Sequence, residues 1–131
     1  MAENKPAIAP DLVRDFVACS HGDFDRVKEL LDEEPNLVNA CWDWGGGDWE
    51  TGLGAAAHVG RRDIAMYLLD RGARIDIFAA AMLGKLDVVR AAVADDPGVV
   101  NVEGPHGIPL IVHARNGGAE AAEVVKFLES V

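Results

Sequence analysis

His58 is the side chain in this sequence whose surroundings best suit acid–base chemistry. An imidazole changes its charge near neutral pH, and a neighbouring carboxylate can orient and polarise it. Asp48 and Glu50 lie shortly before it in the chain. The sequence therefore offers His58, with Asp48 or Glu50, as the candidate catalytic group. The alternative interpretation is a histidine that only contacts a partner.

The other histidines and the cysteines form no recognisable metal-binding pattern. The four histidines are scattered, Cys19 and Cys41 are far apart, and no HxxxH, HExxH or paired CxxC occurs. His106 lies in the connector EGPHGIP, where a turn is expected. The run Gly45–Gly47 lacks the lysine and the following helix of a phosphate-binding loop. We therefore expect neither a metal nor a cofactor.

All three tryptophans of the chain gather around this run of glycines. Trp42, Trp44 and Trp49 are interleaved with three acids, Asp43, Asp48 and Glu50. Tryptophan offers a large contact area and one N–H donor, so it concentrates at binding hot spots. Next to carboxylates it also suits a cationic ligand. The segment is predicted either to form a binding wall or to fold back and pack on the neighbouring connection.

The strongly negative charge of the chain limits the classes of partner that it can bind. The net charge is −10, and seven acids lie between Glu29 and Glu50 while no Lys or Arg follows until Arg61. Binding to nucleic acid requires clustered positive charge, so a nucleic-acid partner is excluded. The acidic stretch is either a solvated face or a surface that favours a cationic ligand or a basic partner.

The expected compartment is the cytoplasm. The chain begins without a basic segment followed by an apolar run, so no signal peptide is predicted. No stretch approaches eighteen consecutive apolar residues, and a membrane span is not expected. The two cysteines are interpreted as reduced thiols.

An internal repeat organises the elements that must position these side chains. A short helical run closes at a glycine, and an aspartate and a second apolar run follow. Three units align on Gly22, Gly60 and Gly84, the second displaced by 38 residues from the first and the third by a further 24, and a fourth unit fits with a short insertion. The units read FVACSHGDFDRVKELL (16–31), GAAAHVGRRDIAMYLL (54–69), FAAAMLGKLDVVRAAV (78–93) and LIVHARNGGAEAAEVVKFL (110–128). Small residues dominate each first helix, as tightly stacked helix pairs require.

These residues resemble the ankyrin-repeat family. The family pattern T-P-L-H-x-A-A-x-x-G is echoed by TGLGAAAHVG (51–60) and IPLIVHARNG (108–117), and L-L-x-x-G-A-x-V-N by LLDRGARID (68–76). The resemblance covers residues 11–131 and implies an all-α ankyrin-repeat solenoid of about four helix–turn–helix units. Gly54, Phe78 and Ile111 replace the pattern's histidine, so irregular helix starts are expected. His113 falls on an alanine position and is expected to be buried and hydrogen-bonded.

Uneven spacing is the main departure from the roughly 33-residue ankyrin period. The connector ACWDWGGGDWE (40–50) is long, whereas Asp76 runs almost directly into Ile77 and the next unit. A long finger beside a missing one predicts a notch between them. The expected units are 11–40, 41–76, 77–102 and 103–131, after an N-terminal tail of residues 1–10.

Two functions remain open at this stage. The resemblance implies a groove lined at two positions of each unit, and with the tryptophan finger this favours a non-enzymatic module that binds another protein. The first position holds Ser20, His58, Met82 and Arg115, and the second holds His21, Val59, Leu83 and Asn116. The alternative is a small-molecule binder, for example of a cation, or an acid–base enzyme with a pocket at His58. The expected binding residues are Trp42, Asp43, Trp44, Asp48, Trp49, Glu50, His58, Met82 and Arg115.

Overall fold

Short α-helices make up most of residues 5–131, the part of the chain that the computed structural model describes. The expectation of a mostly helical chain is therefore confirmed. The helices are α1 (Pro10–Cys19), α2 (Phe24–Glu33), α3 (Gly52–His58), α4 (Arg62–Asp70), α5 (Ile77–Met82), α6 (Leu86–Asp95), α7 (Leu110–Asn116) and α8 (Ala122–Glu129). Of these helices, none has the length and hydropathy that a membrane crossing needs. The expected N-terminal tail lies outside the described residues over positions 1–4.

Smaller elements fill the connections. Four 3₁₀ segments are present, η1 (Pro35–Asn39), η2 (Pro97–Asn101), η3 (Pro105–Gly107) and η4 (Gly118–Ala121). Strands β1 (Cys41–Asp43) and β2 (Trp49–Thr51) form an antiparallel hairpin. The sequence predicts the long connector but not its pairing into strands.

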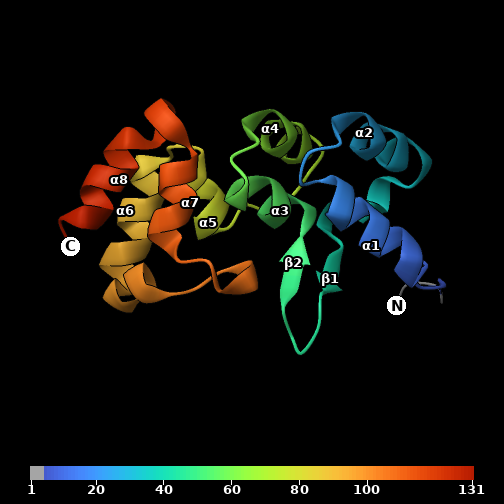
Figure 1. The fold of residues 1–131 in the computed structure, drawn as a ribbon, viewed down its shortest axis with the longest axis horizontal. Coiled ribbons are helices and arrows are strands. Elements are labelled where there is room, and N and C mark those ends of the chain that lie inside the picture. The colour runs from blue at the N-terminus through green and yellow to red at the C-terminus, as the bar shows by residue number, and fades with distance from the viewer. Residues whose placement is uncertain (1–4) are drawn as a thin grey trace.

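The helices follow one another in pairs, and the first helices of the pairs pack side by side. α1 contacts α3, α3 contacts α5, and α5 contacts α7, while each also packs on the helix that follows it. Figure 1 shows the resulting elongated stack, from which the hairpin projects to one side. The pairs lie where the repeat places them.

Helix starts are more regular than the sequence suggests. The Thr51 hydroxyl accepts the N–H of Gly54 at 2.9 Å, and an Asp76 carboxylate oxygen accepts the N–H of Ala79 at 2.8 Å. These side chains cap α3 and α5 at their first turns. The expectation of irregular starts is therefore wrong for both helices, because the capping residue lies before the position where the family histidine is replaced.

Glycines at the helix ends allow the close approach of neighbouring pairs. Gly84 has a φ of +78°, and a Cβ there would lie 2.1 Å from the Glu120 carbonyl oxygen. At Gly117 a Cβ would lie 2.1 Å from the Met82 carbonyl oxygen. A side chain at either position would push the last two helix pairs apart.

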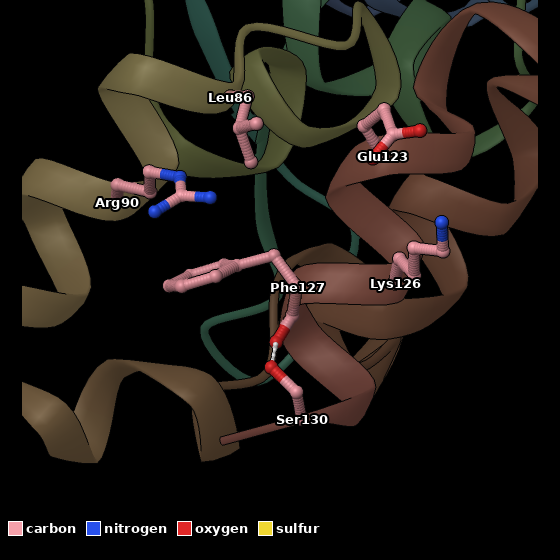
Figure 2. A pocket seen from close by; sticks show the side chains of 6 residues that line it. All are labelled: Leu86, Arg90, Glu123, Lys126, Phe127 and Ser130. Carbon is pink, nitrogen blue, oxygen red and sulfur yellow. Dashed lines mark hydrogen bonds between the residues drawn. The ribbon is translucent and has the colours of Figure 1, made fainter.

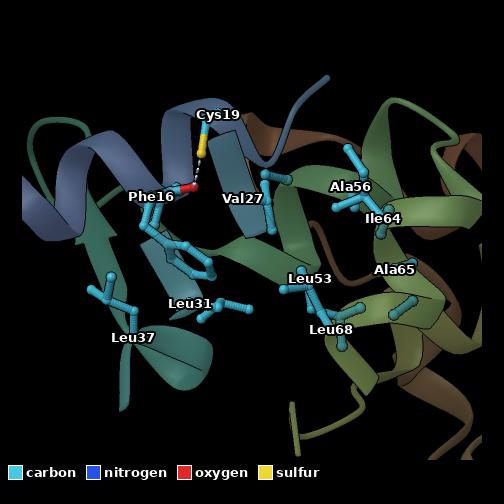
Figure 3. Packing of buried hydrophobic residues seen from close by; sticks show 14 of the residues in the cluster. Phe16, Cys19, Val27, Leu31, Leu37, Leu53, Ala56, Ile64, Ala65 and Leu68 are labelled. Carbon is cyan, nitrogen blue, oxygen red and sulfur yellow. Dashed lines mark hydrogen bonds between the residues drawn. The ribbon is translucent and has the colours of Figure 1, made fainter. Parts of the chain in front are cut away.

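The core runs along the stack as two adjoining apolar clusters. Ala55–Ala57 and Ala79–Ala81 are fully buried, and larger side chains of the second helices and connectors surround them. Figure 3 shows Phe16, Leu53 and Leu68 in the first cluster. Both cysteines are free thiols. Burial of these small residues is the feature that holds the helix pairs together.

Ala80→Leu should overpack the contacts of α5, because its methyl group is fully buried against the last pair. We expect the free energy of unfolding to fall by about 1–3 kcal/mol. Ala91→Leu, on the exposed side of α6, is the matched control and should leave it nearly unchanged. The midpoint of urea unfolding measures both, and equal midpoints would contradict the stacking described above.

Candidate metal centre at the tryptophan hairpin

The hairpin directs the Glu50 carboxylate from β2 toward the interior of the protein. Trp42 pairs with Glu50 and Asp43 with Trp49, and side chains alternate between the two faces of a strand. Trp49 is accordingly 59% exposed, whereas Glu50 is fully buried. At the turn, Asp43 Oδ1 accepts the N–H groups of Gly45 and Gly47, each at 2.9 Å. Asp43 thus shapes the turn, and the strand register buries Glu50.

Two helix ends bring histidines to this carboxylate. His21 follows α1 and His58 ends α3, so the stacking of the first two pairs sets them side by side. Their Nε2 atoms lie 3.1 Å apart. His21 Nε2 lies 3.2 Å from Glu50 Oε1, and His58 Nε2 lies 3.1 Å from Glu50 Oε2. Three potential ligands therefore meet at one point.

A third histidine arrives from the loop before α7. His106 Nε2 lies 3.3 Å from Glu50 Oε1. Asp48 holds this residue from the hairpin, since its carboxylate accepts the His106 N–H at 2.7 Å and Nδ1–H at 2.6 Å. His106 has a φ of +62°, a left-handed conformation that costs free energy for a residue with a side chain. The contact with Asp48 stabilises that conformation at the place where the imidazole reaches Glu50.

This loop contacts the hairpin in the region where the uneven spacing predicts a notch. Asp76 leads straight into α5, so no finger stands between the hairpin and the loop (Figure 1). A Cβ at Gly54 would lie 3.6 Å from Pro105 Cγ, which means that a larger residue there would meet the loop. The missing finger and the missing side chain together let His106 approach.

The ring nitrogens that face Glu50 carry lone pairs when the imidazoles are neutral. His21 Nδ1 lies 3.0 Å from the Ala18 carbonyl oxygen and 3.1 Å from that of Val17, which only accept, so we assign its proton to Nδ1. His106 donates through Nδ1 to Asp48. In the neutral form of each ring, Nε2 is therefore the unprotonated nitrogen, and it is directed at the cluster.

Glu50 carries a negative charge in this setting. Burial alone would raise the pKa of Glu50, but contacts with His21 and His58 and the Trp44 Nε1–H, 2.9 Å from Oε1, lower it well below its usual range. The same contact with Glu50 raises the pKa of His21, although burial opposes it. Glu50 Oε2 is buried and accepts no well-aligned hydrogen bond from residues 5–131. An anion with a free lone pair thus lies among three imidazoles.

The four side chains fit around a single metal ion. Their ligand atoms all lie within 4.8 Å of one another, the one such group in residues 5–131. Neighbouring ligands of one ion lie about 3.3 Å apart in a four-coordinate site and about 3 Å apart in a six-coordinate one. The four separations given above, 3.1–3.3 Å, suit either geometry, and the whole set stays within 4.8 Å. Imidazole with one carboxylate suits Zn²⁺, Fe²⁺, Ni²⁺ or Cu²⁺, whereas Ca²⁺ and Mg²⁺ prefer all-oxygen sites. The sequence shows no metal-ligand spacing because these four residues belong to four separate segments, and the expectation of no metal stays a prediction.

Only some of the residues expected to bind lie at the histidine cluster. Asp48, Glu50, His58 and Trp44 converge at the cluster, and Glu50 rather than Asp48 contacts His58. Trp42 packs on the first core cluster. Met82 is buried where the chain at Gly117 crosses it, so it is not available to a partner, and the expectation of a binding role is corrected. Arg115 is exposed and lies 3.7 Å from Glu129.

Two members of the cluster, His21 and His106, are missing from the residues expected to bind. His21 and His58 lie one and two residues before the helix-closing glycines of successive units. That spacing is the signal from which their proximity could be predicted. His106 does lie at a turn, but no local pattern connects it to Glu50. His113, as expected, is buried, and its Nδ1 lies 3.0 Å from the Pro109 carbonyl oxygen.

A separate hollow lies between α6 and α8 at the C-terminal end. Its volume is about 260 Å³, and the Arg90 guanidinium lies 5.1 Å from the centre of the Phe127 ring (Figure 2). Leu86, Glu123, Lys126 and Ser130 complete the lining. None of these residues belongs to the histidine cluster.

Comparison with known proteins shows a partial similarity to a longer protein. No family model matches the sequence. Over 77 residues, 59% of the chain, it is 32% identical to palmitoyltransferase AKR1 of Eremothecium gossypii. The match spans about a tenth of the length of that protein (10%), so it concerns one segment of the relative.

Trp44→Phe should destabilise the site, because it removes the N–H that Glu50 accepts while keeping an aromatic ring. We expect the free energy of unfolding to fall by about 1 kcal/mol, the cost of a lost hydrogen bond to a buried group. Trp49→Phe is the control, since this more exposed ring makes no hydrogen bond among those found in residues 5–131. Equal unfolding midpoints for the two variants would show that Trp44 does not support Glu50.

Proposed function

We propose that this chain is an ankyrin-type repeat protein that binds one transition-metal ion through His21, Glu50, His58 and His106. In this proposal the solenoid is the scaffold, and the hairpin with the loop before α7 completes the site. The metal is the function that the geometry supports best.

The ankyrin-type assignment rests on agreement between sequence and arrangement. Helix pairs, small residues in the first helices and glycines at the helix ends all follow the family pattern. In this proposal the four units are 11–40, 41–76, 77–102 and 103–131, with one helix pair in each apart from Pro10, the first residue of α1. The similarity to a segment of a much longer protein is compatible with a repeat that recurs in different contexts.

One observation carries the metal assignment. Three imidazole Nε2 atoms meet the buried Glu50 carboxylate at 3.1–3.3 Å, and Glu50 Oε2 lacks a well-aligned hydrogen-bond donor. Neutral imidazoles would point two or more lone pairs at an anion, an arrangement that a cation between them stabilises. The backbone carbonyls behind His21 and the Asp48 carboxylate behind His106 fix the ring orientations, as second-shell partners of metal ligands do. The net charge of −10 further favours the approach of cations.

Zinc titration tests the proposal directly. Purified protein, freed of metal by a chelator, should bind one Zn²⁺ per chain in a competition assay with a chromophoric chelator. Loss of a second-shell partner typically weakens metal binding about 10–100-fold, so His58→Ala or Glu50→Gln should weaken it by at least about 100-fold. Asp87→Asn, at an exposed carboxylate outside the cluster, is the control. Equal affinities for all four proteins would refute the proposed site, provided that circular dichroism shows them folded.

Bound metal should also stabilise the fold. Because the ligands come from four segments, an unfolded chain does not present them together, and binding favours the native state. At free zinc of about 100 times the dissociation constant, we expect the free energy of unfolding to rise by about 2.7 kcal/mol. His58→Ala should lose this increment. A rise of the same size in that variant would place the zinc elsewhere.

We also propose that the hairpin is a recognition surface for another protein, because Trp49 is 59% exposed on an acidic hairpin. Exposed tryptophan is typical of binding hot spots, and the neighbouring acids favour a basic partner in the cytoplasm. Trp49→Ala should weaken capture of a purified partner by about 2 kcal/mol or more, with little loss of folding stability. Met66→Ala, at another exposed apolar side chain, should not. Undiminished capture by Trp49→Ala would place recognition on another surface.

A further inference from the structure

We infer that the metal ion keeps a coordination position open to solvent, on the side opposite Glu50, and that this position takes water or a small monovalent anion. The inference rests on the proposed metal binding and concerns what the bound ion can do. A site closed by protein on every side would serve only to hold the fold together, whereas an open one can bind and activate a ligand.

Burial around the cluster is one-sided. The Glu50 side chain is 0% exposed, whereas His21, His58 and His106 are 28%, 14% and 33% exposed. An ion resting on the carboxylate would thus be covered from the core side and approached by solvent between the imidazoles. The open side is the side of the three rings.

The neighbouring polar groups are already committed elsewhere. Both Asp48 carboxylate oxygens accept hydrogen bonds from His106, and the Trp44 N–H is directed at Glu50 Oε1. Asp43 is held by the turn. Within residues 5–131 the cluster therefore supplies four ligands and no fifth. Further positions of an ion that accepts five or six ligands fall to solvent.

Charge and shape select the class of ligand. A divalent ion with three neutral imidazoles and one carboxylate leaves a net charge of +1 on the site, which favours an anion over a neutral molecule. The Trp44 ring centre lies 6.3 Å from those of His21 and His106, so an indole flanks two of the ligands. The surrounding protein is strongly acidic and disfavours polyanions. Hydroxide, azide and small carboxylates fit these conditions.

Cobalt substitution with azide tests the open position. Protein loaded with one Co²⁺ and passed through a desalting column reports its coordination number through visible absorption bands. We expect the weak bands of a five- or six-coordinate ion, and a saturable shift of those bands with one azide per cobalt. Asp87→Asn protein, loaded in the same way, should behave identically and serves as the matched control.

The possible results distinguish the open coordination position from the proposed metal site itself. Intense four-coordinate bands that azide leaves unchanged would overturn the open position and keep the metal site. Failure of the folded protein to retain cobalt would overturn both. His58→Ala protein is compared with the unmodified protein in the same azide titration. If both have the same starting spectrum and the same shift at each azide concentration, the responding cobalt lies outside the cluster. That result would also overturn the inference.

Discussion

A single buried charge governs the arrangement of the site. Moving a carboxylate out of water costs several kcal/mol unless opposite charges and hydrogen bonds replace its hydration. Glu50 is fully buried, and every polar group around it is explained by that cost. Trp44 donates to it, and His21, His58 and His106 surround it. Protons on the imidazoles or a bound cation can both provide the compensating charge, and a cation can replace the protons at the Nε2 atoms while the Nδ1–H contacts of His21 and His106 stay in place.

The departures from an even repeat make this arrangement possible. An even repeat predicts a finger before α5, between the hairpin and the loop before α7 that contacts Asp48. The abrupt entry from Asp76 into α5 removes that finger. Gly54 leaves room for Pro105, and the left-handed backbone at His106 turns its ring toward the carboxylate. The departures from an even repeat therefore lie at the positions where the four side chains of the cluster meet.

The sequence predicts the scaffold better than the site. Glycine-closed helical runs recur in every unit, and rows of alanine occur in the second and third, so helix pairs and their buried faces follow from local patterns, as at Ala55–Ala57 and Ala79–Ala81. The cluster depends on contacts between residues 21, 50, 58 and 106, and no local spacing encodes these. Met82 illustrates the converse error: its place in the repeat suggested a groove, but the unusually close approach of the last pair at Gly117 buries it.

Anomalous diffraction at the zinc absorption edge tests the central claim most directly. Crystals of the metal-free protein, grown and then equilibrated with one equivalent of Zn²⁺, should give one strong anomalous peak. The account places it about 2.0–2.1 Å from the Nε2 atoms of His21, His58 and His106 and about 2.0–2.2 Å from an oxygen of Glu50. A chain folded as described, with these four side chains in contact but with no peak between them, or with its peak on other residues, would contradict it.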